Sequence, residues 1–224
     1  MCFSAQASFT AAAGLAIIGF LAIYKAHTNT LRLFACTPLF FALQQALEGI
    51  VWLNLMNNNT STMLHTIATY GFVFFAGIFW PVCIPSILYA LETDTLRKKI
   101  LLSTIASGSC VASISAYIII MFGPVARIAE HHIAYDQNWH HTPLVLLCLY
   151  SMYTFAVIVP FFVSSIQTMW LVGLALAIGF VVASISFWLS SGSVWCFFAA
   201  LISALVYKIV MQENKKHSTQ KSAH

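Results

Sequence analysis

The chain has 224 residues, of which 60% are hydrophobic and only 7% are charged, and its net charge is +4 at pH 7. A soluble domain carries about 25% charged residues, so this composition excludes an ordinary soluble protein and indicates an integral membrane protein. Nucleic acid is not an expected partner, because the positive charge lies mostly in short loops and the tail, where it suits anionic lipid.

Apolar runs of spanning length fill most of the chain. Each run is close to or above the roughly 20 residues that a helix needs to cross about 30 Å of hydrocarbon. They are residues 5–24, 33–55, 64–91, 100–121, 144–163, 170–189 and 194–211. We therefore predict an all-α fold with one seven-helix transmembrane domain over residues 1–211. Residues 212–224 are polar and basic, and they are predicted to form a disordered cytoplasmic tail.

The Lys and Arg residues are distributed unevenly among the predicted loops. Nine of the ten lie on one side of the membrane, after the first span, after the third span, or at and beyond the end of the last. Arg127 alone lies on the other side. Because positive residues mark cytoplasmic loops, we predict an outside N-terminus and a cytoplasmic C-terminus. The expected location is a cell membrane, with the bacterial cytoplasmic membrane favoured.

The second span contains a carboxylate. Gln44, Glu48 and Trp52 are four residues apart and share one helix face. If that face met lipid, its polar groups would be unpaired, so it is expected to meet other helices or a wet cavity. We predict an outward-opening polar pocket here, and an interhelical network with a purely structural role is the alternative. The predicted ligand-binding residues are Gln44, Gln45, Glu48, Trp52, His65 and Tyr135.

The loop between the fourth and fifth spans is rich in histidine, with four in residues 131–141. If this loop is helical, His132, Asp136 and His140 share one face at four-residue spacing. Two imidazoles and a carboxylate form a ligand set that zinc accepts. Tyr135 and Trp139 equally suit an aromatic belt at the membrane interface, so both interpretations stay open.

Cysteine is used in two ways. Five of the six cysteines are scattered singly through the apolar runs, which indicates packing rather than a disulfide framework. Cys2 would carry a free amine and a thiol after loss of Met1, so it is a candidate nucleophile or metal ligand. An inert or acylated end is the alternative. The predicted metal is zinc or copper. Its candidate ligands are Cys2, His131, His132, Asp136 and His140.

Three short segments resemble an uncharacterised family of multi-pass bacterial membrane proteins whose members begin Met-Cys-Phe-Ser-Ala. The segments are that opening at residues 1–5, Gln-Ala-Leu-Glu-Gly-Ile-Val-Trp at 45–52, and His-Ile-Ala-Tyr at 132–135. The resemblance implies a seven-helix membrane fold but no reaction. Its matching positions are Cys2, Ser4, Glu48, Trp52, His132 and Tyr135.

Three classes of function remain. The leading interpretation is the binding or transport of a small polar or cationic ligand in an outward pocket around Glu48. The second is a membrane-embedded enzyme, such as a zinc-dependent hydrolase, with a Cys and His site. The third is a structural or accessory membrane protein.

Overall fold

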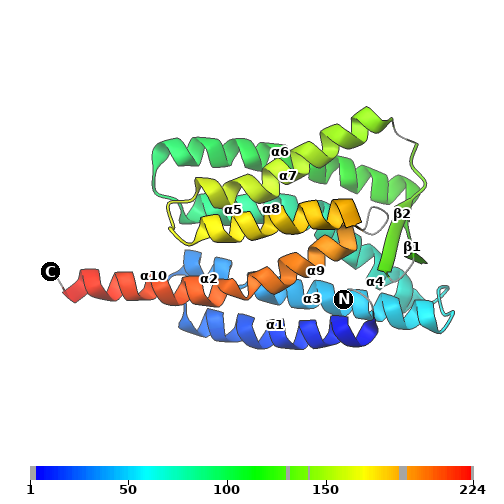
Figure 1. Ribbon diagram of the computed structural model, residues 1–224, viewed down its shortest axis with the longest axis horizontal. Coiled ribbons are helices and arrows are strands. Elements are labelled where there is room, and N and C mark those ends of the chain that lie inside the picture. The colour runs from blue at the N-terminus through cyan, green and yellow to red at the C-terminus, as the bar shows by residue number, and fades with distance from the viewer. Residues whose placement is uncertain (1–3, 130–131, 141, 187–190, 223–224) are drawn as a thin grey trace.

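The protein is a bundle of long helices with a small β-hairpin at one end (Figure 1). This computed structural model describes residues 4–129, 132–140, 142–186 and 191–222. Within these residues, seven helical segments are long and apolar enough to cross a membrane, as the sequence predicts. They are Ala5–Lys25, Asn29–Met56, Met63–Leu91, Thr95–Phe122, Pro143–Val163, Met169–Ser186 and Ser193–Lys215.

Several spans are built from more than one helix. The first span is α1 (Ala5–Lys25), the second joins α2 (Asn29–Ala35) to α3 (Thr37–Met56), and the third joins α4 (Met63–Phe74), the π-helix η1 (Phe75–Phe79) and α5 (Trp80–Leu91). The next three are α6 (Thr95–Phe122), α7 (Pro143–Val163) and α8 (Met169–Ser186). The last joins α9 (Ser191–Ser203) to α10 (Leu205–Ser222). The strands β1 (Pro124–Ala129) and β2 (His132–Gln137) connect α6 to α7.

Polar residues fix where the helices begin. The N-cap side chains each accept a hydrogen bond from the backbone N–H three residues further on, which satisfies a donor that the helix cannot pair internally. These N-caps are Ser4, Thr28, Thr62, Asp94 and Thr142.

The histidine-rich segment between α6 and α7 forms an antiparallel hairpin rather than a helix, with Pro124 opposite Gln137 and Ala129 opposite His132. Gly123 ends α6 with a φ of 65°, a left-handed value that suits glycine and turns the chain into β1. In a strand, residues four apart are separated by about 13 Å. The condition for a shared helical face of His132, Asp136 and His140 is therefore not met.

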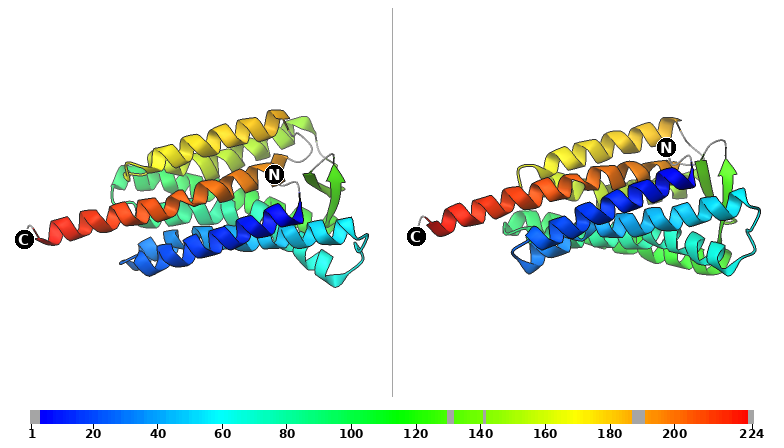
Figure 2. Two further views of the ribbon diagram at one scale, coloured as in Figure 1. Left: turned by 60° about the horizontal axis from the view of Figure 1, so that its bottom comes forward. Right: turned by 90° about the horizontal axis from the view of Figure 1, so that it is seen from below.

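The segment predicted to be a disordered tail continues the last helix, since α10 extends to Ser222. Two hydrogen bonds connect its first turn to the last residue of α1 and to the turn before α8. Asn214 Nδ2 donates to the Lys25 carbonyl at 2.6 Å, and Thr168 Oγ1 donates to Gln212 Oε1 at 2.7 Å. Gln, Glu and Lys in this stretch also have good helix propensity. Figure 2 shows α10 projecting past the bundle at the end away from the hairpin.

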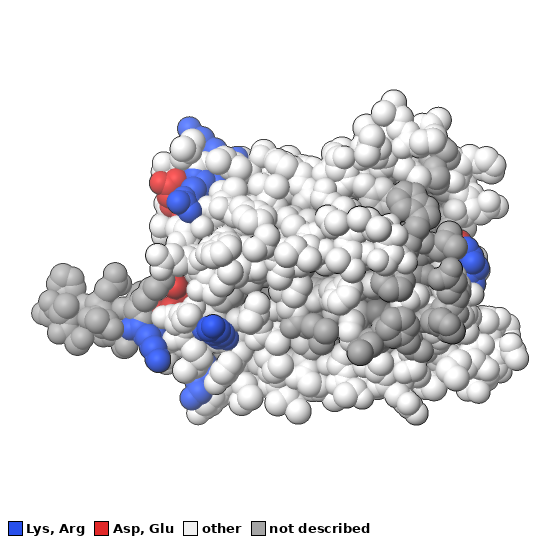
Figure 3. Space-filling view, viewed as in Figure 1, with Lys and Arg blue, Asp and Glu red and all other residues white. Residues whose placement is uncertain are grey.

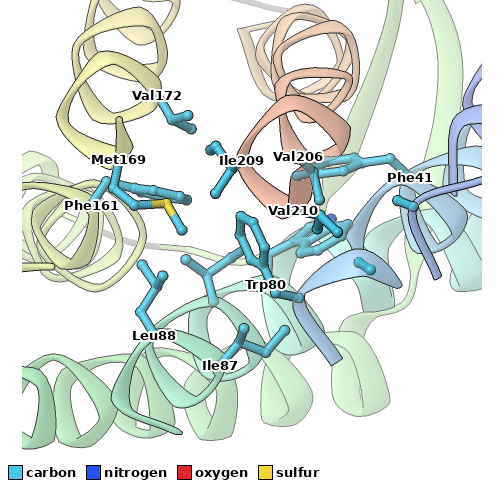
Figure 4. Close-up of a cluster of buried hydrophobic side chains, with 14 of the residues drawn as sticks. Phe41, Trp80, Ile87, Leu88, Phe161, Met169, Val172, Val206, Ile209 and Val210 are labelled. Carbon is cyan, nitrogen blue, oxygen red and sulfur yellow. The ribbon is translucent and has the colours of Figure 1, made fainter. Parts of the chain in front are cut away.

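The largest group of buried apolar side chains extends from α1 and α2 to α3, α5, α7, α8 and α10, and Figure 4 labels its part between the last five helices. Phe41 and Trp80 stack in it with ring centroids 3.9 Å apart. Beside it, α5 and α6 approach so closely that a Cβ at Gly108 would lie 1.7 Å from the Pro81 carbonyl oxygen. Only glycine permits that approach, which fixes how α5 crosses α6.

The charge asymmetry of the sequence becomes an asymmetry of the two ends of the bundle. Most basic side chains on the visible face gather at the end of the bundle opposite the hairpin (Figure 3). At the hairpin end, β1 carries Arg127. The long sides of the visible face carry almost no charge, as a lipid-facing surface requires (Figure 3).

Candidate functional site

The polar face of α3 is completely buried: Gln44, Gln45 and Glu48 are each 0% exposed. Ser193 of α9 donates a hydrogen bond to Glu48 Oε1, and Gln45 Nε2 donates to Glu48 Oε2 at 3.3 Å. Burying a carboxyl group without such partners would cost several kcal/mol. The polar face therefore meets α9 and not lipid, as its helical spacing predicts.

Gln44 joins three helices. It accepts a hydrogen bond from Trp80 Nε1 of α5 at 2.7 Å and donates to Cys196 Sγ of α9 at 3.4 Å. Ser193 and Cys196 are three residues apart and lie on one side of α9. Two neighbouring turns of α9 are thus bound to two neighbouring turns of α3.

Beside this network lies an open cavity of about 510 Å³ at the hairpin end, which we call the outer cavity. It lies between α4, η1, α6, α7, α9 and the hairpin, and both Ser193 and Cys196 line it. Five tyrosine and tryptophan side chains also line it: Tyr135, Trp139, Tyr150, Tyr153 and Trp195. None of the described lining residues is Lys or Arg.

The aromatic walls are held by specific contacts. Tyr135 stacks on Phe72 with ring centroids 4.4 Å apart and planes at 8°. Tyr153 meets Trp195 edge to face at 5.5 Å and 66°, and Trp195 Nε1 donates to the Leu176 carbonyl at 3.2 Å. These are favourable aromatic geometries, so the cavity has a preformed shape.

Tyr153 also donates a hydrogen bond to a backbone carbonyl of the third span that has no donor from its own helix. The backbone N–H of Trp80 bonds to the Phe75 carbonyl in the π-helical pattern, and the next residue, Pro81, has no N–H. The Ala76 carbonyl is thus left without a donor from its own helix. The Tyr153 hydroxyl donates to it at 2.8 Å. Single π-helical turns of this kind are frequent at functional sites.

The sequence profile of a family of unknown function (DUF6629) matches residues 1–222. The chain belongs to this family. No curated protein and no solved structure matches it. Membership agrees with the resemblance to an uncharacterised family, and it assigns no activity.

The residues predicted to form one ligand pocket divide into two groups. Gln44, Gln45 and Glu48 form the network, and Tyr135 lines the outer cavity next to it. Trp52 is 4% exposed and packs with Ala68, Ala126 and Ile133, while His65 is 7% exposed near the start of α4. In the part of the chain that the structure describes, no hydrogen bond joins Trp52 or His65 to Glu48, and Trp52 Nε1 and His65 Nδ1 have no partner.

The predicted metal ligands differ in their burial and in their contacts. Cys2, the candidate nucleophile, and His131 lie outside the described residues. Asp136 forms an ion pair with Arg127, His132 is buried at 3% exposure, and His140 is exposed. Over residues 4–129, 132–140, 142–186 and 191–222, no three His, Cys, Asp or Glu side chains come together as a metal site would require. The metal site stays a prediction.

Sequence reasoning missed Ser193, Cys196, Tyr153, Trp195 and Trp139 as site residues. A weak signal exists in α7, where Leu146, Leu149, Tyr150 and Tyr153 recur at helical spacing and all line the cavity. In a helix that is apolar on every side, such spacing does not identify one face over another. The interaction of α9 with Glu48 crosses 145 positions of sequence, and no local pattern reports it.

Proposed function

We propose that the protein binds a small organic cation in the outer cavity. The observation that carries this proposal is an open cavity with five tyrosine and tryptophan side chains in its lining and no Lys or Arg among its described lining residues. The face of an aromatic ring attracts a cation, and several rings around one space form the aromatic cage that recognises quaternary ammonium groups.

The network behind the cavity supports the same sign of charge. Ser193 lines the cavity and donates a hydrogen bond to Glu48, so it links the cavity lining to the buried carboxylate. Glu48 lies directly behind Ser193, and a carboxylate there favours a positive ligand. Asp136 also lines the cavity, but its charge is paired with that of Arg127.

We propose that the hairpin end faces outward and that the basic end faces the cytoplasm, in a bacterial cytoplasmic membrane. The gathering of basic side chains at the opposite end supports this orientation (Figure 3). The outer cavity would then receive its ligand from outside the cell.

Choline and its neutral isostere, in which a quaternary carbon replaces the nitrogen, test this proposal. The purified full-length protein in detergent is titrated with each compound while tryptophan fluorescence is recorded, because Trp139 and Trp195 line the cavity. We expect choline to change the emission saturably and the isostere to bind at least about tenfold more weakly, since cation–π attraction is worth about 2 kcal/mol or more where it is desolvated.

Two variants localise the effect. Trp139→Ala removes a ring of the cavity and should weaken choline binding by roughly threefold to thirtyfold. Trp170→Ala removes a tryptophan that is 51% exposed and does not line the cavity, so its affinity should equal that of the wild type. Equal binding of choline and the isostere, or no choline binding at all, would contradict the proposal and return attention to the enzymatic and structural alternatives.

A further inference from the structure

A second cavity lies deeper in the bundle, further from the hairpin than the outer cavity. It has a volume of about 40 Å³, room for a few water molecules, and we call it the inner cavity. Four aromatic side chains in its lining belong to it alone: Phe34, Phe41, Trp80 and Phe161. Figure 4 shows three of these, Phe41, Trp80 and Phe161, within the buried core.

The two cavities share three lining residues, Tyr153, Trp195 and Cys196. These side chains therefore form the partition between the outer and the inner cavity. Each is held from a different direction: Tyr153 by the Ala76 carbonyl of η1, Trp195 by the Leu176 carbonyl of α8, and Cys196 by Gln44 of α3. The partition is closed only while α7 and α9 keep their positions against these three elements.

One face of α7 lines both cavities. Its lining residues are Leu146, Leu149, Tyr150, Tyr153, Val157 and Phe161, which follow the three-to-four-residue period of a helix, with Leu149 and Tyr150 adjacent. From Leu146 to Phe161 the helix rises about 22 Å at 1.5 Å per residue. That is most of the roughly 30 Å hydrocarbon core of a membrane. The lining residues of the two cavities are thus spread along α7 over a length comparable to most of the hydrocarbon core.

We propose that the two cavities form a translocation path for the organic cation, and that Tyr153 and Trp195 are its closed gate. This rests on the proposed function, because it takes the same ligand one step further. Aromatic rings continue from the outer to the inner cavity, and a quaternary ammonium ion can move between such rings without full hydration. A small inorganic ion would need oxygen ligands, and Thr37 and Ser203 are the only hydroxyl side chains besides Tyr153 in the described lining of the inner cavity.

Cysteine accessibility tests the gate without any ligand. In a background with Cys196→Ser, which keeps an acceptor for Gln44, and all other cysteines changed to alanine, Ala199→Cys places a thiol in the lining of the inner cavity. The full-length protein in sealed vesicles is exposed at its hairpin side to a membrane-impermeant, quaternary ammonium thiol reagent. We expect slow labelling when the gate is intact. Adding Trp195→Ala should accelerate it by roughly tenfold or more, because a truncated buried side chain leaves a cavity that the surroundings only partly fill.

Cysteines at two control positions show whether the faster labelling is specific to the inner cavity. Leu149→Cys lines the outer cavity and should be labelled rapidly whether or not Trp195 is present. Val210→Cys replaces a residue that is 0% exposed and is not part of either lining, so it should stay protected in both backgrounds. Tyr153→Phe is a milder second variant, which keeps the ring and removes the bond to Ala76, and it should accelerate labelling less than Trp195→Ala. Equal acceleration at the Ala199 and Val210 positions, or acceleration at neither with both gate variants, would overturn the gate.

Choline flux into proteoliposomes then separates this inference from the proposed function. We expect the wild-type protein to accelerate uptake over protein-free vesicles, and Trp195→Ala to accelerate it further at saturating choline, where the weaker binding that follows the loss of one ring no longer limits the rate. Choline binding without flux in either protein would overturn the translocation path and leave the binding function intact. Gated labelling without choline binding would contradict the proposed function and the substrate class, while the gate itself would stand.

Discussion

Among the residues that the structure describes, two glutamates are buried, and they are held in opposite ways. Glu48 lies inside the second span at 0% exposure and accepts from the side chains of Ser193 and Gln45. Glu92 lies at 2% exposure in the short loop after α5, near the basic end of the bundle. It accepts from the backbone N–H groups of Thr93, Asp94 and Ser165 at 2.9, 3.1 and 2.7 Å.

The difference indicates which carboxylate is structural. Backbone donors are fixed by the fold, so Glu92 is a permanent connection between the loop before α6 and the segment before α8. Burial pushes the pKa of Glu92 upward, but the hydrogen bonds from the backbone of Asp94, Ser165 and Thr93 together outweigh it, so its pKa lies below the ordinary value. Side-chain donors such as Ser193 can rotate, which leaves Glu48 able to respond to a ligand next to it.

The largest expected effect concerns the sides of the membrane on which the two glutamates lie. Reporter fusions after Asn58, near the hairpin end, should read outside, and fusions after Asp94 and Glu213 should read inside. The result is all-or-none at each site. Paired phosphatase and fluorescent-protein reporters supply the measurement, and a cytoplasmic signal at Asn58 would reverse the orientation that we propose for the outer cavity.

Next in size is the loss of the Glu92 carboxylate. Glu92→Ala removes three charge-assisted, partly buried hydrogen bonds from backbone N–H groups, so we expect the free energy of unfolding to fall by about 3 kcal/mol. Thermal unfolding of the purified protein measures this. Glu92→Gln keeps one acceptor oxygen and should recover part of the loss. An alanine variant as stable as the wild type would show that Glu92 is not a structural connection.

Glu48→Gln should change ligand binding more than stability, the reverse of what we expect for Glu92→Ala. The carboxylate that favours a cation is lost, so we expect choline affinity to fall by roughly tenfold. Stability should change by less than about 1 kcal/mol, because a neutral amide is easier to bury than a charge. Gln45 Oε1 lacks a hydrogen-bond partner within the described part of the chain. After the Gln45 amide flips, this oxygen can accept a hydrogen bond from the amide introduced at position 48. Lower stability with unchanged choline affinity would make Glu48 as structural as Glu92.

The smallest expected effect is the pH dependence of Glu92. Because its pKa is lower in the folded protein, its contribution to stability is fully present above the unfolded pKa of about 4.3 and is lost as pH falls through the folded value. The difference in melting temperature between the wild type and Glu92→Gln should therefore be constant near neutral pH and shrink below about pH 4.3. A difference that grows on acidification would contradict this assignment.

The hairpin and η1 are two places where the local sequence pattern does not predict the structure. The spacing of His132, Asp136 and His140 suits a helix, yet the segment pairs as strands because Gly123 ends α6 and the two halves of the loop satisfy each other's backbone groups. In the third span, Pro81 has no N–H and leaves the Ala76 carbonyl without a donor from its own helix. That Tyr153, 77 positions away, supplies the missing proton could not be read from either segment.

The sequence by itself determined the spans, the uneven distribution of charge and the burial of Glu48. Each follows from a local rule, since a helix must be apolar over its spanning length, basic residues stay on one side, and a polar face must avoid lipid. Only the tertiary structure decided that Ser193 and Cys196 meet Glu48 and Gln44, and that Tyr153 and Trp195 separate two cavities. Helices that are apolar all round carry no mark of which face meets which neighbour, so their partners are chosen by side-chain packing among all of them at once.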